Sequence, residues 1–386
     1  MLKKDNIRVV VQQPSLAKYR VPLFRQWSKT EWVDLKLFYS NLDSALPNDS
    51  PEGFSAEFVP INQFRLFGRR FLWHSAQTKN ASKKHCDVLV LSWDLHYLSL
   101  VPALLLAKKR GVKTILWGHG YSKNESKLRK FLRDTVARFA DALVFYDFVT
   151  ARRYIDTGWD VNQIHVAPNS LDLEPIYDAY RHWSRSPERI DAFQKQQGLD
   201  SRVNIIYIGR LYSDNRLDVL IRALPVVCRR HPNAQLLIIG KENEYSKELV
   251  DIAKQVRVSN HIRWFGSIYD EREIAPLMMS SAIFCYPANV GLSLVHAMAY
   301  GLPVVTSDSI DSHNPEIHTM KIGFNGFVYK HLDSVDLGNR IADALDDQIY
   351  LEMLGNNARE TIAHGFTIER MVDGFMSAVT SVYVDS

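Results

Sequence analysis

Short apolar runs alternate with amphipathic stretches along the first half of the chain. Apolar residues recur at helical spacing around residues 98–110, 125–139 and 149–157. The apolar runs that lie before, between and after these stretches are IRVVVQQ at 7–13, VDLKLFY at 33–39, DVLVLS, KTILW, ALVFY and IHVAP. Short apolar runs predict buried strands, and strands that alternate with helices are typical of a mostly parallel sheet covered on both faces.

A second series of the same kind follows a polar, irregular stretch that ends near Arg202. Its apolar runs are NIIYIG, QLLII, HIRWF, AIFCY, PVVTS and GFVY, and helical patterns at 216–231, 244–256, 271–280 and 291–300 separate the first five. This series predicts a second doubly wound domain. Such sheets bind ligands at the carboxyl ends of their strands, so two facing domains would enclose a site between two loop-rich rims.

The chain is too long for one hydrophobic core, since it has 386 residues of which 46% are hydrophobic. We expect an α/β protein with an N-terminal domain over 1–170, a linker over 171–202 and a C-terminal domain over 203–365. A last helical segment, 366–386, is expected to cross back and pack on the N-terminal domain.

Charge is unevenly distributed between the two halves of the chain. Residues 1–190 hold 29 Lys and Arg against 19 Asp and Glu, whereas residues 191–386 hold 18 against 24. The basic first half is suited to an anionic partner such as lipid headgroups, a pyrophosphate-linked acceptor or nucleic acid, or else it is a solvated basic face. Zinc-finger spacing, a basic zipper and the aromatic signature of RNA-binding modules do not occur in the sequence, so nucleic acid is not expected.

The cysteines and the apolar segments predict a cytoplasmic location. Cys86, Cys228 and Cys285 are odd in number, far apart and set in apolar surroundings, which is typical of reduced thiols and offers no metal-site spacing. The start MLKKDNIRVVV runs into a strand without the pattern of a secretory signal. The most apolar later segment, YLSLVPALLLA, is about half a bilayer crossing and contains Pro102, so it is interpreted as a core helix.

The segment PANVGLSLVHAMAYGLPVV, residues 287–305, predicts a loop, a helix that begins at a bare glycine, and a buried strand. A helix N-terminus presents unpaired N–H groups and a partial positive charge, so Gly291 leaves room there for an anion. The alternative is a helix that simply packs under a sheet.

A second candidate anion site lies in YIGRLYSDNRLDVLIRALP, where a strand ends at Gly209 and a helix starts near Arg216. Gly209 permits close backbone approach, Arg210 offers a forked donor, and Arg216 lies about one helical turn further on. This arrangement suits a diphosphate, although exposed arginines are also common on surfaces.

These motifs resemble, in order and spacing, the nucleotide-sugar domain of glycosyltransferase family 4. The strand-end glycine of LLIIGKENE, the WFGSI loop, PEI and GFNGFVY agree with it, and QQPSLAKYRVPLF, ILWGHG and HVAPNSLD resemble the acceptor domain. The resemblance implies the GT-B architecture, two Rossmann-like domains that face each other across a cleft. It further implies that Gly291 and Leu292 bind the donor's diphosphate through their N–H groups, and that His119 contacts the donor sugar.

Two departures from the family pattern affect the donor side. The two glutamates that the family places eight residues apart are replaced by Ala288 and His296, a change that resembles a variant branch of bacterial polysaccharide glycosyltransferases and favours altered donor recognition. The family's phosphate lysine is displaced, because Asn215 holds the aligned position and Arg216 is the adjacent cation. Lys241 and Glu316 are further donor-side candidates, and His296 is expected to reach the rim of the site.

The stretch FRLFGRRFLWH, residues 64–74, interleaves arginines with aromatic side chains. Aromatic rings favour the headgroup boundary of a bilayer and arginines favour anionic lipid, so a peripheral membrane or acceptor face is one hypothesis. The other is a helix with an apolar core face. The side chains concerned are Arg65, Arg69, Arg70 and Trp73.

The sequence therefore predicts a cytoplasmic enzyme, peripheral on the inner face of the membrane. It would move a sugar from a nucleotide diphosphate sugar to a lipid-linked glycan with retention of configuration. His119 and Arg210 are the expected catalytic residues, and neither a metal nor another cofactor is expected. The alternatives are a catalytically silent GT-B protein that binds a glycan or a partner, and a GT-B sugar epimerase or phosphorylase.

Overall fold

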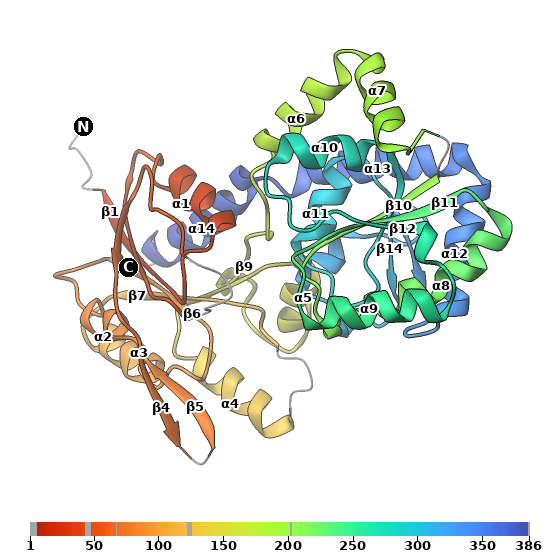
Figure 1. Cartoon of the computed structure of the whole chain (residues 1–386). Helices are drawn as coiled ribbons and strands as arrows, with labels where there is room; N and C mark the ends of the chain where they lie inside the picture. The colour runs from red at the N-terminus through yellow and green to blue at the C-terminus, as the bar shows by residue number, and fades with distance from the viewer. Residues whose placement is uncertain (1–5, 43–47, 67, 122–125, 201–202, 385–386) are drawn as a thin grey trace. The chain divides into compact units, whose positions relative to one another are not determined.

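The computed structural model describes residues 6–42, 48–66, 68–121, 126–200 and 203–384. The chain divides into two compact units, and each is described here by itself (Figure 1). Unit 1 comprises residues 1–169 together with 368–386, and unit 2 comprises residues 170–367.

Unit 1 is built on a seven-stranded sheet with the order β3-β2-β1-β6-β7-β8-β9. Every neighbouring pair is parallel. The central strands are buried on both faces because helices cover both sides, as the unbroken apolar run of β6 requires. The strands are β1 (Ile7–Gln13), β2 (Val33–Tyr39), β3 (Ser55–Phe58), β6 (Val88–Ser92), β7 (Lys113–Trp117), β8 (Ala142–Phe145) and β9 (Ile164–Val166).

Helices pack on the two faces of this sheet in two separate hydrophobic clusters. One face carries α1 (Val21–Trp27) and the C-terminal helix α14 (Ile368–Val384), which lie side by side in Figure 1. The other cluster includes residues of α2 (Ser75–Lys79), α3 (Leu100–Lys109), α4 (Lys127–Ala137) and α5 (Phe148–Asp156).

The C-terminal helix contributes large side chains to the core of unit 1. The ring of Phe375 lies 4.6 Å from that of Trp27 and 4.7 Å from that of Trp117. Gly374 lies so close to β9 that a Cβ atom there would be 2.1 Å from the carbonyl oxygen of Val166. The helix therefore fits against the sheet only because this position has no side chain.

The basic aromatic stretch is a hairpin, so the expectation of a core helix over 64–74 is wrong. Strand β4 (Asn62–Leu66) pairs antiparallel with β5 (Arg69–Trp73). Aromatic and basic residues alternate with a period of two, as in Phe64-Arg65 and Arg70-Phe71, and this is the period of a strand. Gly68 reverses the chain with a φ of 71°, a conformation that glycine adopts without strain.

Unit 2 contains a six-stranded sheet with the order β12-β11-β10-β13-β14-β15, again with parallel neighbours. Helices α8 (Leu217–Arg230), α9 (Glu244–Gln255), α10 (Glu271–Met279) and α11 (Leu292–Ala299) connect successive strands, and α12 (Ser334–Asp346) and α13 (Gln348–Gly365) follow the last strand. The strands are β10 (Val203–Ile208), β11 (Ala234–Ile239), β12 (Ile262–Trp264), β13 (Ser281–Cys285), β14 (Val304–Ser307) and β15 (Gly326–Tyr329).

The stretch 171–202, expected as a linker, is helical and belongs to unit 2. It forms α6 (Glu174–Ser184) and α7 (Pro187–Gln197), and α6 packs against α10. Both helices start at or next to a proline, which is favourable in the first turn, and α6 buries Ile176 and Ala179. Within the described residues, no helix combines the length and apolar character that crossing a bilayer requires.

Candidate functional site

The candidate site of unit 2 lies at the carboxyl ends of β10 and β13, which are neighbours in the sheet. The chain order of the strands reverses between them, and doubly wound sheets bind ligands at such a switch point. Gly209 follows β10, and the loop that leads to α11 follows β13. The residues singled out in these two segments by their sequence therefore lie on neighbouring strand ends.

Gly209 is required by packing. A Cβ atom at this position would lie 2.8 Å from the ring of Tyr286, and that ring stacks on Tyr207 with centroids 4.7 Å apart. The loops after β10 and β11 also touch, because a Cβ at Gly240 would lie 2.4 Å from the carbonyl oxygen of Gly209. Lys241 follows directly and is exposed, without an ion pair to any described residue.

Asn215, which holds the position of the expected lysine, joins the two loops from a buried site. Its amide nitrogen donates to the carbonyl oxygen of Arg210 at 2.6 Å. Its amide oxygen accepts from the side chain of Asn289 at 3.2 Å, and its carbonyl oxygen accepts from the N–H of Ala288 at 3.2 Å. Asn215 therefore has a structural role that the sequence motif did not indicate.

Arg210 and Arg216 differ in how far their charges are compensated. The Arg210 side chain is exposed and lies over the ring of Tyr212 at 5.1 Å, and it has no acidic partner among the described residues. Arg216 pairs bidentately with Asp218, with both N–O distances at 2.9 Å. Tyr245 donates a further hydrogen bond to Asp218 at 3.0 Å.

The pairing keeps Asp218 ionised. Burial alone would raise the pKa of this carboxyl group, but the hydrogen bonds and the charge of Arg216 outweigh it and lower the pKa below its ordinary value. Arg216 also adopts a left-handed backbone with a φ of 54°, where it ends the 3-10 turn Ser213–Asn215 and precedes α8. Arg210 is therefore the cation of this pair that is available to an incoming anion.

The start of α11 is open, as its sequence predicts. Gly291 precedes Leu292, no side chain caps the helix, and its first turn contains no acidic residue. A Cβ atom at Gly291 would lie 3.2 Å from the amide nitrogen of Asn314 and 3.7 Å from a carboxylate oxygen of Glu316. Any side chain at this position would fill the space between the helix start and these two groups.

The structure corrects the expected position of His296 at the rim. The imidazole is buried, and its Nε2 atom lies 2.7 Å from Glu271 at the start of α10. Tyr300 donates to the same carboxylate oxygen at 2.7 Å. Burial would raise the pKa of Glu271, but the hydrogen bond from His296 is among the contacts that outweigh it and lower the pKa. His296 thus has a partner inside the protein that its place in the motif did not reveal.

His119 lies in unit 1, directly after the carboxyl end of β7. Its ring is exposed and lies 4.8 Å from that of Tyr146, measured between centroids. The two flanking glycines are required by packing. A Cβ at Gly118 would meet Trp93 at 3.0 Å, and one at Gly120 would meet Phe145 at 2.5 Å.

Arg20 is a neighbour of this site that the sequence analysis missed. The side chain is 7% exposed, and its guanidinium lies 4.9 Å from the ring of Trp117 and 5.4 Å from that of Tyr146. It also donates to the hydroxyl group of Tyr146 at 3.4 Å. No signal around QQPSLAKYR distinguishes this arginine from a surface residue, because its partners come from distant strands.

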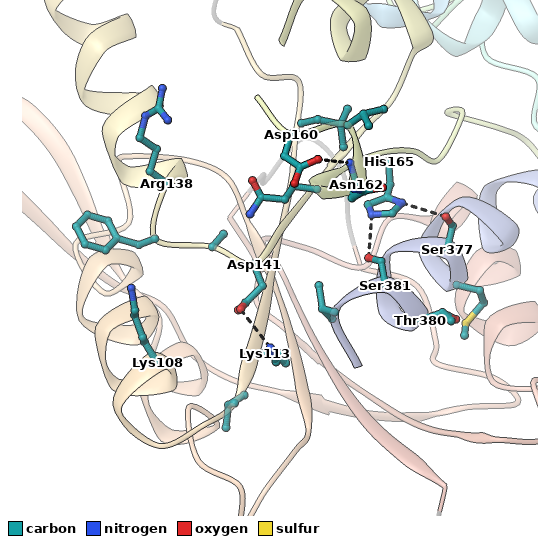
Figure 2. Close-up of a pocket in the computed structure, with 18 of the residues that line it drawn as sticks. Lys108, Lys113, Arg138, Asp141, Asp160, Asn162, His165, Ser377, Thr380 and Ser381 are labelled. Carbon is teal, nitrogen blue, oxygen red and sulfur yellow. Dashed lines mark hydrogen bonds and ion pairs between the residues drawn. The ribbon is translucent and has the colours of Figure 1, made fainter. Parts of the chain in front are cut away.

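A separate hollow of about 1390 Å³ lies at the opposite edge of the unit 1 sheet, where β7, β8 and β9 begin (Figure 2). His165 contacts the hydroxyl groups of Ser377 and Ser381 there, each at 3.0 Å. Burial lowers the pKa of His165. These contacts tie β9 to α14, and the hollow shares no residue with the strand end that carries His119.

No cluster of three or more His, Cys, Asp or Glu residues suited to a metal ion occurs among the described residues.

Residues 189–361, all within unit 2, match the family described as glycosyl transferases group 1. Phosphatidyl-myo-inositol mannosyltransferase of Mycobacterium tuberculosis is 29% identical over 213 residues, which cover 53% of this chain and 49% of the relative. The chain spans about half the length of this relative and of spore coat protein SA of Bacillus subtilis.

Solved structures extend the likeness of this chain to both units. Anabaena Alr3699/HepE in complex with UDP and glucose has a TM-score of 0.69 at 16% identity and covers 97% of this chain and 100% of its own. A glycosyltransferase from Rickettsia africae has a TM-score of 0.74 at 15% identity, with 99% and 100% covered. At this identity the likeness shows the fold alone: GT-B, with two Rossmann-like domains.

Proposed function

We propose that this chain is a glycosyltransferase that moves a sugar from a nucleotide diphosphate sugar to a lipid-linked glycan at the inner face of a membrane. The observation that carries the proposal is the exposed guanidinium of Arg210, which has no acidic partner among the described residues. Arg210 follows β10, the neighbour of the strand β13 that leads to the uncapped helix start at Gly291. The name of the mycobacterial relative, which is a mannosyltransferase for a phosphatidyl lipid, supports a lipid-linked acceptor. The Anabaena structure was solved with UDP and glucose, which supports the donor class.

The proposed chemistry is stabilisation of a leaving diphosphate by fixed positive groups. As the bond between the anomeric carbon and the phosphate oxygen breaks, negative charge grows on that oxygen, and preorganised donors that meet it lower the barrier. Arg210 and the N–H groups at Gly291 and Leu292 are assigned to supply this charge without a metal, with Lys241 as a further cation. Arg216 is assigned a lesser part, because Asp218 compensates its charge. A helix N-terminus and charge-assisted bonds together favour an anion at such a place.

Retention of configuration follows if the acceptor attacks on the face that the diphosphate leaves. The acceptor oxygen then bonds to the anomeric carbon, and its proton passes to the departing phosphate oxygen. No protein nucleophile is required. His119 is assigned to positioning the sugar, and Glu316, whose carboxylate lies beside Gly291, is assigned to the donor side in a chain that has Ala288 in place of the usual glutamate.

Removal of the Arg210 guanidinium tests this proposal. We expect Arg210→Ala to lower kcat/KM by more than about tenfold, because a hydrogen bond to a charged group contributes about 1.5–3 kcal/mol. Calorimetry with the nucleotide diphosphate should show a parallel loss of affinity. Arg229→Ala, at an exposed arginine on α8, is the matched control and should leave both quantities unchanged. A folded Arg210→Ala enzyme with wild-type turnover would remove the central support of the proposal.

The second candidate is a catalytically silent GT-B protein that binds a glycan, and the observation that favours it is Ala288. This side chain is 3% exposed and its N–H is bound to Asn215, so the position that usually supplies a carboxylate is closed. Release of free nucleotide diphosphate, measured with and without acceptor lipid, separates the two. Release only when acceptor is present supports transfer, whereas donor binding without any release supports the silent protein.

A further inference from the structure

The N-terminal half of α4 leaves its apolar side chains in solvent. Leu128 is 69% exposed, Phe131 66% and Leu132 48%. The buried positions of this helix, Arg133 and Ala137, lie in its second half. Helices of globular proteins normally turn such residues toward a core, so an apolar patch at the start of a helix indicates a surface that binds something.

The same half of the helix is strongly basic. Lys127, Arg129 and Lys130 alternate with the apolar residues, and all three are exposed. The one acidic residue of α4 is Asp134, which lies 2.7 Å from Lys130. A helix start normally favours acidic side chains, since its dipole is positive there, so these three cations oppose the dipole, and only for Lys130 does the pair with Asp134 offset this.

The hairpin carries a second concentration of positive charge. Arg65 and Arg70 lie directly opposite each other in the antiparallel pair, and both are exposed. Like charges at directly opposed positions destabilise a sheet, and an anion bound to both would relieve the repulsion. Phe64, on the neighbouring position of the same strand, is 49% exposed and faces Phe71 across the hairpin.

The hairpin and α4 form one surface. A hollow of about 870 Å³ is lined by Arg69 and Arg70 from β5 and by Leu128, Arg129 and Leu132 from α4. Asp94 is the acidic side chain of this lining, and it is bound to His96 at 2.7 Å. Figure 1 shows α4 and the hairpin at the same end of unit 1. We call this the basic apolar surface, defined by residues 64–65, 69–71 and 127–132.

We propose that the basic apolar surface docks on an anionic lipid bilayer. Leu128, Phe131 and Leu132 would enter the boundary between headgroups and acyl chains, and the opposed arginines of the hairpin would bind lipid phosphates. Apolar side chains surrounded by Lys and Arg are typical of helices that lie in the plane of an anionic membrane. The positive charge of the surface favours an anionic bilayer over a protein partner, because five exposed cations have no acidic partner among the described residues: Arg65, Arg69, Arg70, Lys127 and Arg129.

This inference rests on the proposed function for the location at a membrane and adds the surface that makes the contact. A protein that fails to dock through this surface but still transfers sugar to a lipid-linked acceptor would contradict the inference and leave the proposed transfer intact. A protein that docks but neither binds nor cleaves a donor would contradict the proposed function alone.

The experiment measures cosedimentation with vesicles of phosphatidylcholine and with vesicles that also contain phosphatidylglycerol. One variant carries Leu128→Ser, Phe131→Ser and Leu132→Ser, and another carries Arg65→Gln and Arg70→Gln. The matched apolar control is Ile349→Ser with Met353→Ser, two exposed positions on α13. The matched charge control is Lys247→Gln with Lys254→Gln on α9. All the substituted side chains of the four variants are exposed.

We expect the wild type and both controls to bind the anionic vesicles and to bind the neutral ones far less. In each test variant, the ratio of lipid-bound to free protein should fall by at least about tenfold, because several basic or apolar contacts are removed at once. High salt should weaken binding by screening the arginines, with less effect on the apolar contribution. Circular dichroism confirms that the variants are folded.

Two results would overturn the proposal. The first is wild-type binding by the Leu128, Phe131 and Leu132 variant, which would mean that the apolar residues do not enter the bilayer. The second is a wild-type protein that does not bind anionic vesicles but forms a dimer in analytical ultracentrifugation, together with loss of that dimer in the Leu128, Phe131 and Leu132 variant. That outcome would assign the surface to a second copy of the chain.

Discussion

His74 shows how a single buried side chain links stability to pH. The ring is fully buried at the start of α2, and within the described residues neither of its nitrogens has a hydrogen-bond partner. Burial lowers its pKa from 6.5 to about 4. The unfolded chain therefore binds a proton between these two values while the folded protein does not, so the free energy of unfolding falls as the pH is lowered through this range.

We predict that unit 1 loses on the order of 3 kcal/mol of stability between pH 6.5 and 4 through His74. The variant His74→Leu should lack this part of the slope. This pH dependence is measured by urea unfolding at several pH values, with tryptophan fluorescence as the signal. The signal reports mainly on unit 1, because six of the eight tryptophans lie there. Replacement of the exposed His85 by Leu is the control. An unchanged slope in His74→Leu would mean that the folded protein accepts the proton after all.

The pair formed by His296 and Glu271 gives a second prediction at this scale. Both groups are largely buried, and Tyr300 shares the same carboxylate oxygen. We predict that His296→Ala lowers the free energy of unfolding by about 1–3 kcal/mol, because Glu271 loses a buried partner. Its effect on nucleotide diphosphate affinity should be smaller than that of Arg210→Ala.

A double-mutant cycle with Glu271→Gln isolates the interaction between the two side chains, since coupled partners give non-additive changes. Normal stability together with a collapse of nucleotide affinity in His296→Ala would restore a donor-binding role to this histidine.

At the scale of helices and strands, the sequence predicted regular elements well wherever apolar periodicity alone determines them. The predicted strands at 7–13 and 33–39 match β1 and β2 residue for residue. The hairpin over 62–73 was missed. One of the two hypotheses for residues 64–74 was a helix, and the described aromatic side chains that were expected to face a core are partly exposed to solvent instead. Helices α6 and α7 were missed because their composition is polar: α6 buries only Ile176 and Ala179, and α7 buries no residue.

The candidate site was predictable where a local motif encodes it and hidden where long-range packing does. Arg210 and Gly291 follow from the strand-turn-helix order around them. Arg20 and the partner of His296 depend on contacts between elements far apart in the sequence, which no local pattern records.

The close contact of α14 with β9 gives a prediction for helix packing. Gly374→Ala should destabilise unit 1 by about 1–3 kcal/mol, because its Cβ would overlap the backbone of Val166, which has no room to move. Gly365→Ala is the matched control, since a Cβ there meets no atom within 4 Å and alanine is favourable in a helix. Thermal unfolding of both variants measures the difference. Equal melting temperatures would mean that α14 shifts to accommodate the methyl group.

At the scale of the whole molecule, the two units each have a hydrophobic core of their own, as the length and composition of the chain predict. The excess of positive charge in the first half of the sequence is matched by the basic apolar surface of unit 1. Chain composition could indicate that an anionic partner exists, but only the folded structure identifies which helix and which hairpin would meet it.

Helix α14 belongs to unit 1 but follows unit 2 in the sequence, and this order affects folding during synthesis on the ribosome. Domains generally fold as units in the order in which they are made. Here the core of the first unit lacks Met371, Phe375 and Val379 until the last residues of the chain have been translated. Unit 2 contains its whole core by Thr367 and can fold while unit 1 still waits for its final helix. A nascent chain stalled at that residue and released from the ribosome should therefore resist protease in its second half and be cut in its first.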